Sequence, residues 1–253
     1  MHFTVLIPAR MASQRLPGKP LVDLLGKPLI VHVCERARDS GAAQVLVATD
    51  DQRIYDACAA AGFRAELTST EHASGTDRIA EVVTRLNLDD AEIVVNLQGD
   101  EPLMPAADIQ QVAQLLDAHE DAQMATLCTP IHELEDYLNP NVVKLVSDQA
   151  GNALYFSRAP IPWNREGAIA SLASQQHWQG ALRHIGMYAY RVRALRQLAA
   201  ASPCESEQLE KLEQLRALWL GMKIAVDVAR EAPGPGVDTP EDLKRVTKIL
   251  QNN

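Results

Sequence analysis

The sequence has few cysteines and no excess of basic residues. Its four cysteines, in a chain of 253 residues, are scattered without C-x-x-C spacing. This arrangement fits reduced thiols better than disulfides or a metal site, and it favours a cytoplasmic protein. The formal net charge of −9 argues against nucleic acid or an anionic membrane surface as a partner.

Long hydrophobic runs and two common phosphate-binding motifs are also missing. The apolar runs are far shorter than a membrane-spanning helix requires, and the first of them, Phe3–Ile7, lacks the basic lead of a signal peptide. We therefore expect no membrane insertion. No G-x-G-x-x-G follows this run, and Gly18-Lys19 lacks the earlier glycine and the following Ser or Thr of a P-loop.

A cationic, proline-rich segment follows the first apolar run. Residues 8–20 read P-A-R-M-A-S-Q-R-L-P-G-K-P and carry three cations, Arg10, Arg15 and Lys19. The prolines remove backbone donors and fix φ, so this segment is predicted to be a stiff loop. Pre-placed positive charges leaving a buried strand suit a polyphosphate. From the residues alone, an ordinary loop with solvated charges is an equally good interpretation.

Apolar runs alternate with helical periodicity through the first half of the chain, which predicts a parallel sheet with helical crossovers. The predicted strands are 3–7, 44–48, 63–67, 92–97 and 124–128, and the predicted helices are 29–40, 52–61, 78–86 and 105–119. The second half is richer in strands, with a hairpin at 142–157 and a strand at 184–190. Helices at 193–201 and 205–220 and a strand at 223–228 follow, and Asp238 is the expected N-cap of a last helix. Residues 166–180 are not assigned.

Two polar segments lie where binding chemistry is expected. Ser74 and Gly75 precede a predicted helix, where they either cap it or offer N–H groups to an anion. Asp100 follows the strand 92–97 directly after Gly99, at the carboxyl end where open α/β sheets bind ligands. Beside a triphosphate, this carboxylate would suit Mg²⁺. The alternative is that Asp100 caps the next helix.

Seven motifs resemble, in the same order, those of the 3-deoxy-D-manno-octulosonate (Kdo) cytidylyltransferases, a subfamily of the sugar nucleotidyltransferases. They are the loop 8–20, S-G-T-D-R, Q-G-D-E-P, A-L-Y-F-S-R, R-H-I-G-M-Y, E-K-L-E-Q-L-R and G-V-D-T-P-E-D-L. The resemblance implies one Rossmann-like, three-layer α/β/α nucleotidyltransferase domain over residues 1–253, with a mostly parallel sheet and a β-rich late insert. Residues 131–190 are expected to form a sugar-side and dimerisation subregion.

The resemblance also implies a reaction and a set of site residues. CMP would pass from CTP to the anomeric 2-hydroxyl of Kdo for lipopolysaccharide synthesis, with pyrophosphate released and Mg²⁺ held by Asp100 and Asp238. The implied catalytic residues are Arg10, Lys19, Asp100 and Asp238, and the implied nucleotide-binding residues are Pro8, Ala9, Arg10, Ser13, Arg15, Lys19, Ser74, Gly75, Arg78 and Gln98. The implied Kdo-binding residues are Arg158, His184, Tyr188, Glu210 and Gln214.

Several alternatives remain open at this point. The partners implied are CTP, Kdo and a second copy of the chain, but another acidic sugar (sialic acid or 8-amino-Kdo) or a catalytically silent nucleotide-binding module would leave the first loop alike. His184 has the alternative of a core histidine. Asp227 matches no motif, so we expect it not to bind the metal.

Overall fold

The computed structural model describes residues 1–13, 15–72, 74–167 and 175–252. Its main strands are β1 (Phe3–Ala9), β4 (Gln44–Thr49), β5 (Arg64–Leu67), β6 (Ile93–Asn96), β7 (Met124–Pro130), β8 (Lys144–Ser147), β9 (Ala153–Ser157), β10 (Leu182–Arg191) and β11 (Ile224–Val228). Two short strands, β2 (Asp23–Leu24) and β3 (Lys27–Pro28), form a small separate hairpin.

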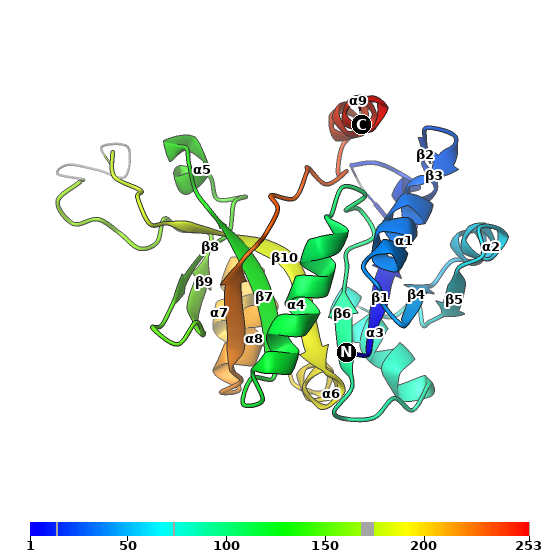
Figure 1. The fold of residues 1–253 in the computed structure, drawn as a ribbon, viewed down its shortest axis with the longest axis horizontal. Helices are drawn as coiled ribbons and strands as arrows, with labels where there is room; N and C mark the ends of the chain where they lie inside the picture. Colours follow the sequence, from blue (N-terminus) through cyan, green and yellow to red (C-terminus); the bar gives the residue numbers. More distant parts are fainter. Residues whose placement is uncertain (14, 73, 168–174, 253) are drawn as a thin grey trace.

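Nine strands of this described part form one mixed sheet, and helices lie on both of its faces (Figure 1). The strand order is β11-β7-β10-β6-β1-β4-β5, and β8 adds to the sheet by pairing with β10 and with β9. Strands β1, β4, β5 and β6 pair in parallel, as does β11 with β7, whereas β10 is antiparallel to both β6 and β7. The predicted α/β class and the mostly parallel sheet with a β-rich later region are confirmed.

The helices of the described residues lie mostly on the two faces of the sheet, apart from the short helix at 134–138 and the last helix, which belong to separate clusters. They are α1 (Leu29–Asp39), α2 (Gln52–Ala60), α3 (Gly75–Arg85), α4 (Ala106–Ala118), α5 (Leu134–Leu138), α6 (Val192–Ala200), α7 (Glu205–Glu210), α8 (Gln214–Trp219) and α9 (Pro240–Gln251), with a 3-10 turn at Lys19–Leu21. Within the described residues, no helix has both the length and the apolar character needed to cross a membrane.

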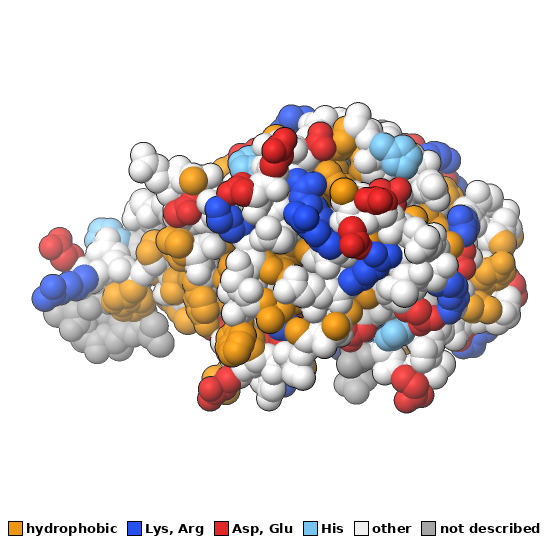
Figure 2. Space-filling model, turned by 90° about the horizontal axis from the view of Figure 1, so that it is seen from below, with side chains coloured by type: hydrophobic (Ala, Val, Ile, Leu, Met, Phe, Trp, Pro, Cys, Tyr) orange, Lys and Arg blue, Asp and Glu red, His pale blue; other side chains and the backbone are white. Residues whose placement is uncertain are grey.

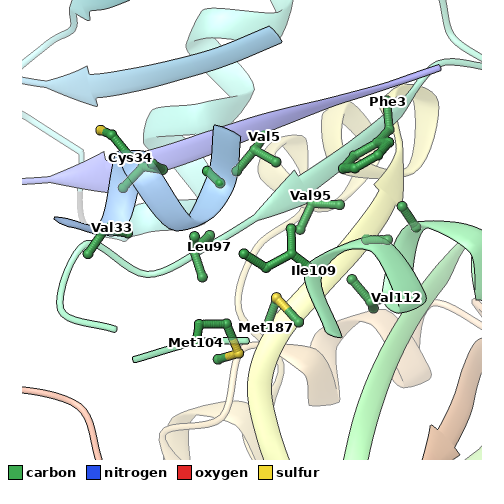
Figure 3. Close-up of a cluster of buried hydrophobic side chains, with 14 of the residues drawn as sticks. Phe3, Val5, Val33, Cys34, Val95, Leu97, Met104, Ile109, Val112 and Met187 are labelled. Carbon is green, nitrogen blue, oxygen red and sulfur yellow. The ribbon is translucent and has the colours of Figure 1, made fainter. Parts of the chain in front are cut away.

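Each face of the sheet has its own hydrophobic core. Figure 3 shows part of the first, in which Val33 and Cys34 of α1 and Ile109 of α4 pack against the strand residues Val5 and Val95. The second core packs α3, α6 and α8 against the opposite face. Alternation along buried strands sends successive side chains to the two cores, so the three-layer arrangement follows from the sequence pattern.

A third cluster joins the two ends of the chain. Leu16 of the first loop and Leu29 of α1 pack with Val237 and with Val246 of α9. In addition, the Val237 N–H donates to the Asp100 carbonyl at 2.8 Å. These contacts bring the segment before α9 against the loop after β6, although the two are far apart in the sequence.

The prediction of one helix over 205–220 is wrong, because the structure has two helices there, α7 and α8. Lys211 ends α7 in the left-handed region at φ 54°, and α8 starts at Gln214. The break lets Leu212 and Leu215 enter the second core, and it lets Arg216 pair with Glu207. A continuous helix would place Glu210, Glu213 and Gln214 on one face at i, i+3 and i+4 spacing, but they lie in α7, in the break and in α8.

Two predicted helix starts are also corrected. Asp238 is not the N-cap of α9: Thr239 is, because its hydroxyl accepts from the Asp242 N–H at 3.2 Å while the Asp242 carboxylate accepts from the Thr239 N–H at 3.0 Å. The helix predicted to begin at residue 78 begins at Gly75, with Ser74 as N-cap. Capping is thus one role of Ser74, and the Asp238 carboxylate is left available for other contacts.

The sugar-side subregion remains a prediction. Residues 131–190 contain α5, β8 and β9 and most of β10, and β8 ties them to the main sheet. Of the unassigned stretch 166–180, residues 168–174 lie outside the described part of the chain.

Candidate active site

A cleft of about 900 Å³ lies at the carboxyl ends of β1 and β6. All ten predicted nucleotide-binding residues line it: Pro8, Ala9, Arg10, Ser13, Arg15, Lys19, Ser74, Gly75, Arg78 and Gln98. Asp100 and Asp238 line it as well. The fold therefore gathers in one cavity the first loop, the start of α3, the loop after β6 and the segment before α9.

Glycines allow these segments to approach closely. A Cβ atom on Gly99 would lie 2.9 Å from the Pro8 carbonyl oxygen, and one on Gly75 would lie 3.1 Å from the Pro8 ring. Contacts below 3 Å with backbone are not tolerated without movement, so a side chain at position 99 would push the loop after β6 away from β1. Gly99 thereby sets the distance between Asp100 and the first loop.

Lys19 connects Asp100 and Asp238, the two carboxylates that the family resemblance implies as metal ligands. Its Nζ donates to Asp100 Oδ2 at 2.6 Å and to Asp238 Oδ1 at 3.0 Å, and Arg15 Nη2 lies 3.0 Å from Asp238 Oδ2. Burial acts to lower the pKa of Lys19, but the two carboxylates outweigh it and raise the pKa above its ordinary value. Lys19 is therefore a firmly charged ammonium lying between Asp100 and Asp238.

Glu101 belongs to the same acidic group, although the sequence analysis gave it no role. Burial, followed by the negative charges of Asp100 and Asp238, raises the pKa of Glu101 to about 8. A Cβ on Gly236 would lie 3.0 Å from its Oε1, so the segment before α9 packs tightly on this carboxyl group. The signal available in the sequence was its place in Q-G-D-E-P, next to Asp100.

Two further cleft residues, His72 and Glu213, were also missed. Glu213 lies in the break between α7 and α8, and a continuous helix gave no reason to separate it from its neighbours. His72 Nε2 lies 2.5 Å from Glu81 Oε2 on α3. Glu213 adds a carboxylate to a cleft otherwise rich in arginine and lysine.

Arg78 lines the cleft, but its guanidinium group is occupied within the protein. Nη2 donates to Asp50 Oδ2 at 2.7 Å and Nη1 to the Thr68 hydroxyl at 2.5 Å, and the side chain is buried. These bonds fix the start of α3 relative to β4 and β5. Arg78 therefore shapes the cleft wall, and its assignment to nucleotide binding stays a prediction.

Two of the predicted Kdo-binding residues, Arg158 and Glu210, are bonded to each other. The Glu210 carboxylate accepts from the Ser157 hydroxyl at 2.7 Å and from the Arg158 N–H at 2.8 Å, and Arg158 Nε donates to the Glu210 carbonyl at 2.6 Å. Lys144, which is fully buried, donates to the carbonyls of Asn139, Val142 and Arg158. Burial lowers the pKa of Lys144 to about 8. This network anchors the end of β9 to α7.

Of the other three, Tyr188 and Gln214 are buried and His184 is partly buried, and Tyr188 belongs to the second core. Burial lowers the pKa of His184 to about 3, and its Nε2 lies 3.0 Å from the Thr126 hydroxyl. The rings of His184 and Tyr188 adjoin each other, with centroids 5.1 Å apart. Tyr188 Oη and Gln214 Nε2 are buried without a hydrogen-bond partner among the described residues. Gln214 directly follows the cleft residue Glu213 in the chain.

Asp227 lies apart from the cleft, as expected for a residue outside the motifs. It is in β11, and its carboxylate accepts from Gln111 Nε2 of α4 at 2.9 Å. Gln111 also donates to the Val228 carbonyl. Asp227 therefore joins β11 to α4.

The fold and the cleft together define a protein of the nucleotidyltransferase class: a mixed α/β sheet with a basic, carboxylate-lined cavity at the ends of its parallel strands. Comparison with known families gives a match of residues 4–224 to the model described as "Cytidylyltransferase". The chain belongs to the cytidylyltransferase family.

Curated relatives match over nearly the whole chain. A protein of Alkalilimnicola ehrlichii and one of Thioalkalivibrio sulfidiphilus, both named "3-deoxy-manno-octulosonate cytidylyltransferase", are each 56% identical over 251 residues. The alignments cover 98% and 99% of this chain and 96% and 100% of the relatives. The sequence-based recognition of this family is thus confirmed.

Solved structures agree with this assignment. A CMP:2-keto-3-deoxy-manno-octonic acid synthetase complexed with CTP superposes with a TM-score of 0.89 at 41% identity, covering 100% of this chain and 99% of that one. A 4-diphosphocytidyl-2C-methyl-D-erythritol synthase, at 14% identity and a TM-score of 0.63, shares the fold.

Proposed function

We propose that this enzyme transfers CMP from CTP to the anomeric 2-hydroxyl of Kdo and releases pyrophosphate. The observation that carries the proposal is the full-length identity of 53–56% to relatives named for this activity. In the reaction, the sugar hydroxyl oxygen forms a bond to the α-phosphorus while the bond to the pyrophosphate oxygen breaks. The hydroxyl proton passes to solvent. Such a step depends mainly on positioning and on neutralising charge.

The cleft supplies both requirements for the nucleotide. Arg10, Arg15 and Lys19 all line it, so three cations face the volume in which we place the triphosphate. The N-terminus of α3, an 11-residue helix, contributes free N–H groups beside Ser74 and Gly75. Pro8, Ala9 and Gln98, at the ends of β1 and β6, are proposed to contact the nucleoside and the phosphates nearest to it.

We propose that Asp100 and Asp238 hold Mg²⁺. The donor set fits a hard cation, because both groups are carboxylates and both contact the same ammonium nitrogen. Among the described residues, no cluster of three His, Cys, Asp or Glu side chains could hold a metal alone, so phosphate oxygens and water would complete the coordination. When bound, the ion would neutralise phosphate charge and lower the pKa of the attacking hydroxyl.

The sugar is proposed to bind on the side of the cleft formed by Glu213. Tyr188 Oη and Gln214 Nε2 have unused hydrogen-bonding capacity, and a polyhydroxylated ligand is well suited to provide their partners. We propose that His184 and Arg158 also contact the sugar. Substituting Tyr188→Phe should therefore raise KM for Kdo while the calorimetric affinity for CTP stays near that of the wild type.

We further propose that the enzyme is a cytoplasmic homodimer. Large apolar side chains are exposed on β9, α7 and α8, namely Leu154, Tyr155, Leu209 and Trp219. Figure 2 shows hydrophobic side chains gathered on part of one face of the molecule. Exposed apolar surface of this kind favours an isologous interface. Light scattering at micromolar concentration should report a dimer, and a monomer would contradict the proposal.

The activity is tested by measuring pyrophosphate release from CTP. We expect release only when CTP, Mg²⁺ and Kdo are all present. Sialic acid and 8-amino-Kdo serve as matched alternative acceptors. Faster pyrophosphate release with either one than with Kdo would identify that sugar as the acceptor. CTP binding without release for any acidic sugar would indicate a silent nucleotide-binding module.

A further inference from the structure

The space between Asp100 and Asp238 contains the ammonium group of Lys19. Its Nζ is 2.6 Å from Asp100 and 3.0 Å from Asp238, and the Lys19 side chain is 17% exposed. Arg15 approaches Asp238 from the solvent side with a largely exposed side chain. Lys19 and Arg15 together offset the two negative charges.

One position cannot hold Lys19 and a divalent cation at once. Mg²⁺ binds carboxylate oxygens at about 2.0–2.1 Å, so an ion shared by Asp100 and Asp238 would lie close to where Nζ now lies. The two positive charges would also repel each other at that range. For a cation to occupy the carboxylate pair, Lys19 has to leave it.

The phosphate oxygens of an entering triphosphate are alternative partners for the Lys19 ammonium group. Lys19 lines the cleft proposed for the phosphates, and a flexible lysine side chain can turn from a carboxylate to a phosphate oxygen. A triphosphate entering without a cation would meet the negative charges of Asp100, Asp238 and Glu213 once Lys19 had turned away. The nucleotide and the cation therefore each lower the electrostatic cost of binding the other.

We propose that Lys19 is a place-holding cation, in addition to being a phosphate ligand. In the free enzyme it neutralises and positions the carboxylate pair and competes with divalent cations for it. On CTP binding it moves to the phosphates and leaves the pair to the metal. This inference rests on the proposed function, and it makes CTP and the metal raise each other's affinity by the same factor.

The first test uses Mn²⁺ as the probe and no nucleotide. Calorimetry or Mn²⁺ electron paramagnetic resonance should show weak binding to the wild type and at least tenfold tighter binding to Lys19→Met. Lys27→Met is the matched control, because Lys27 also pairs with a carboxylate, Glu35 at 2.7 Å, but does not line the cleft. The control should bind Mn²⁺ as the wild type does.

A double variant shows whether the gain arises at the carboxylate pair. Lys19→Met with Asp238→Asn should lose the tighter Mn²⁺ binding, and thermal unfolding of each variant checks that it is folded. In Lys19→Met, the factor by which saturating Mn²⁺ raises CTP affinity should fall at least tenfold. If Lys19→Met binds Mn²⁺ no more tightly than the wild type, the place-holding role is overturned whether or not the enzyme is active. Absence of CMP transfer by the wild type would overturn the proposed function alone.

Discussion

Replacing Asp238 by Asn, with Asp227→Asn as its control, separates the two aspartates near the C-terminal end of the chain. Asp238 lines the cleft and contacts Lys19 and Arg15, whereas Asp227 contacts Gln111 between β11 and α4. The Asp238 side chain is 45% exposed, so losing its ion pairs should lower the free energy of unfolding by less than about 1 kcal/mol.

The effect of Asp238→Asn on catalysis should be much larger than its effect on stability. Losing one charge interaction that acts mainly in the transition state costs about 3 kcal/mol, which is about a hundredfold in turnover. Asp227→Asn should keep turnover within about twofold, because the amide oxygen still accepts from Gln111. Pyrophosphate release at saturating CTP and Kdo, with thermal unfolding in parallel, measures both quantities. An inactive Asp227→Asn beside a fully active Asp238→Asn would refute the assignment.

Three further substitutions test separate parts of the structure. Because burial lowers the pKa of His184 to about 3, the unfolded chain binds a proton between about pH 6.5 and pH 3 that the folded chain does not. In that window, acidification should lower the free energy of unfolding of the wild type by up to about 1.4 kcal/mol per pH unit. His184→Gln should lack this loss, and urea unfolding at several pH values measures it. Lys144→Met removes the ammonium donor of the Asn139, Val142 and Arg158 carbonyls, of which Asn139 keeps the Val142 N–H, and should lower the unfolding free energy by about 2–3 kcal/mol. Unchanged stability would be the contrary result. Glu213→Gln should lower kcat/KM about tenfold without changing stability, and a wild-type rate would exclude Glu213 from the site.

The nucleotide side of the site could be predicted from the sequence because its residues are local. The cations Arg10, Arg15 and Lys19 follow the end of β1 at Ala9, and Asp100 lies four residues after the end of β6 at Asn96. The ends of these two paired strands therefore place the cations and the carboxylate near one another. The proximity of Asp238 to Asp100 could not be predicted from local sequence, because it depends on long-range contacts. These are the cluster around Leu16 and Val237 and the hydrogen bond from the Val237 N–H to the Asp100 carbonyl. Only the family motif pointed to Asp238.

The sugar side was harder to predict because it depends on a helix break. The segment 205–220 has continuous helical character, and nothing local indicates that Lys211 adopts a left-handed conformation. The break is stabilised by tertiary contacts, namely Leu212 and Leu215 in the core and Glu207 paired with Arg216. As a result, Glu213 faces the cleft and Glu210 bonds to Ser157 and Arg158.

The capping of α9 is a similar case on a smaller scale. Asp238 and Thr239 are both good N-cap residues, so the sequence permits either one. The structure uses Thr239, which forms a reciprocal pair with Asp242. The carboxylate of Asp238 therefore contacts Lys19 and Arg15 rather than the helix backbone.

The measurement that tests the central claim most directly is pyrophosphate release from CTP by the purified protein, with and without Kdo and with and without Mg²⁺. We expect pyrophosphate release that requires both Kdo and Mg²⁺, with CMP-Kdo formed in equal amount. Release that is independent of the sugar, or none with Kdo under conditions where CTP binds, would contradict it.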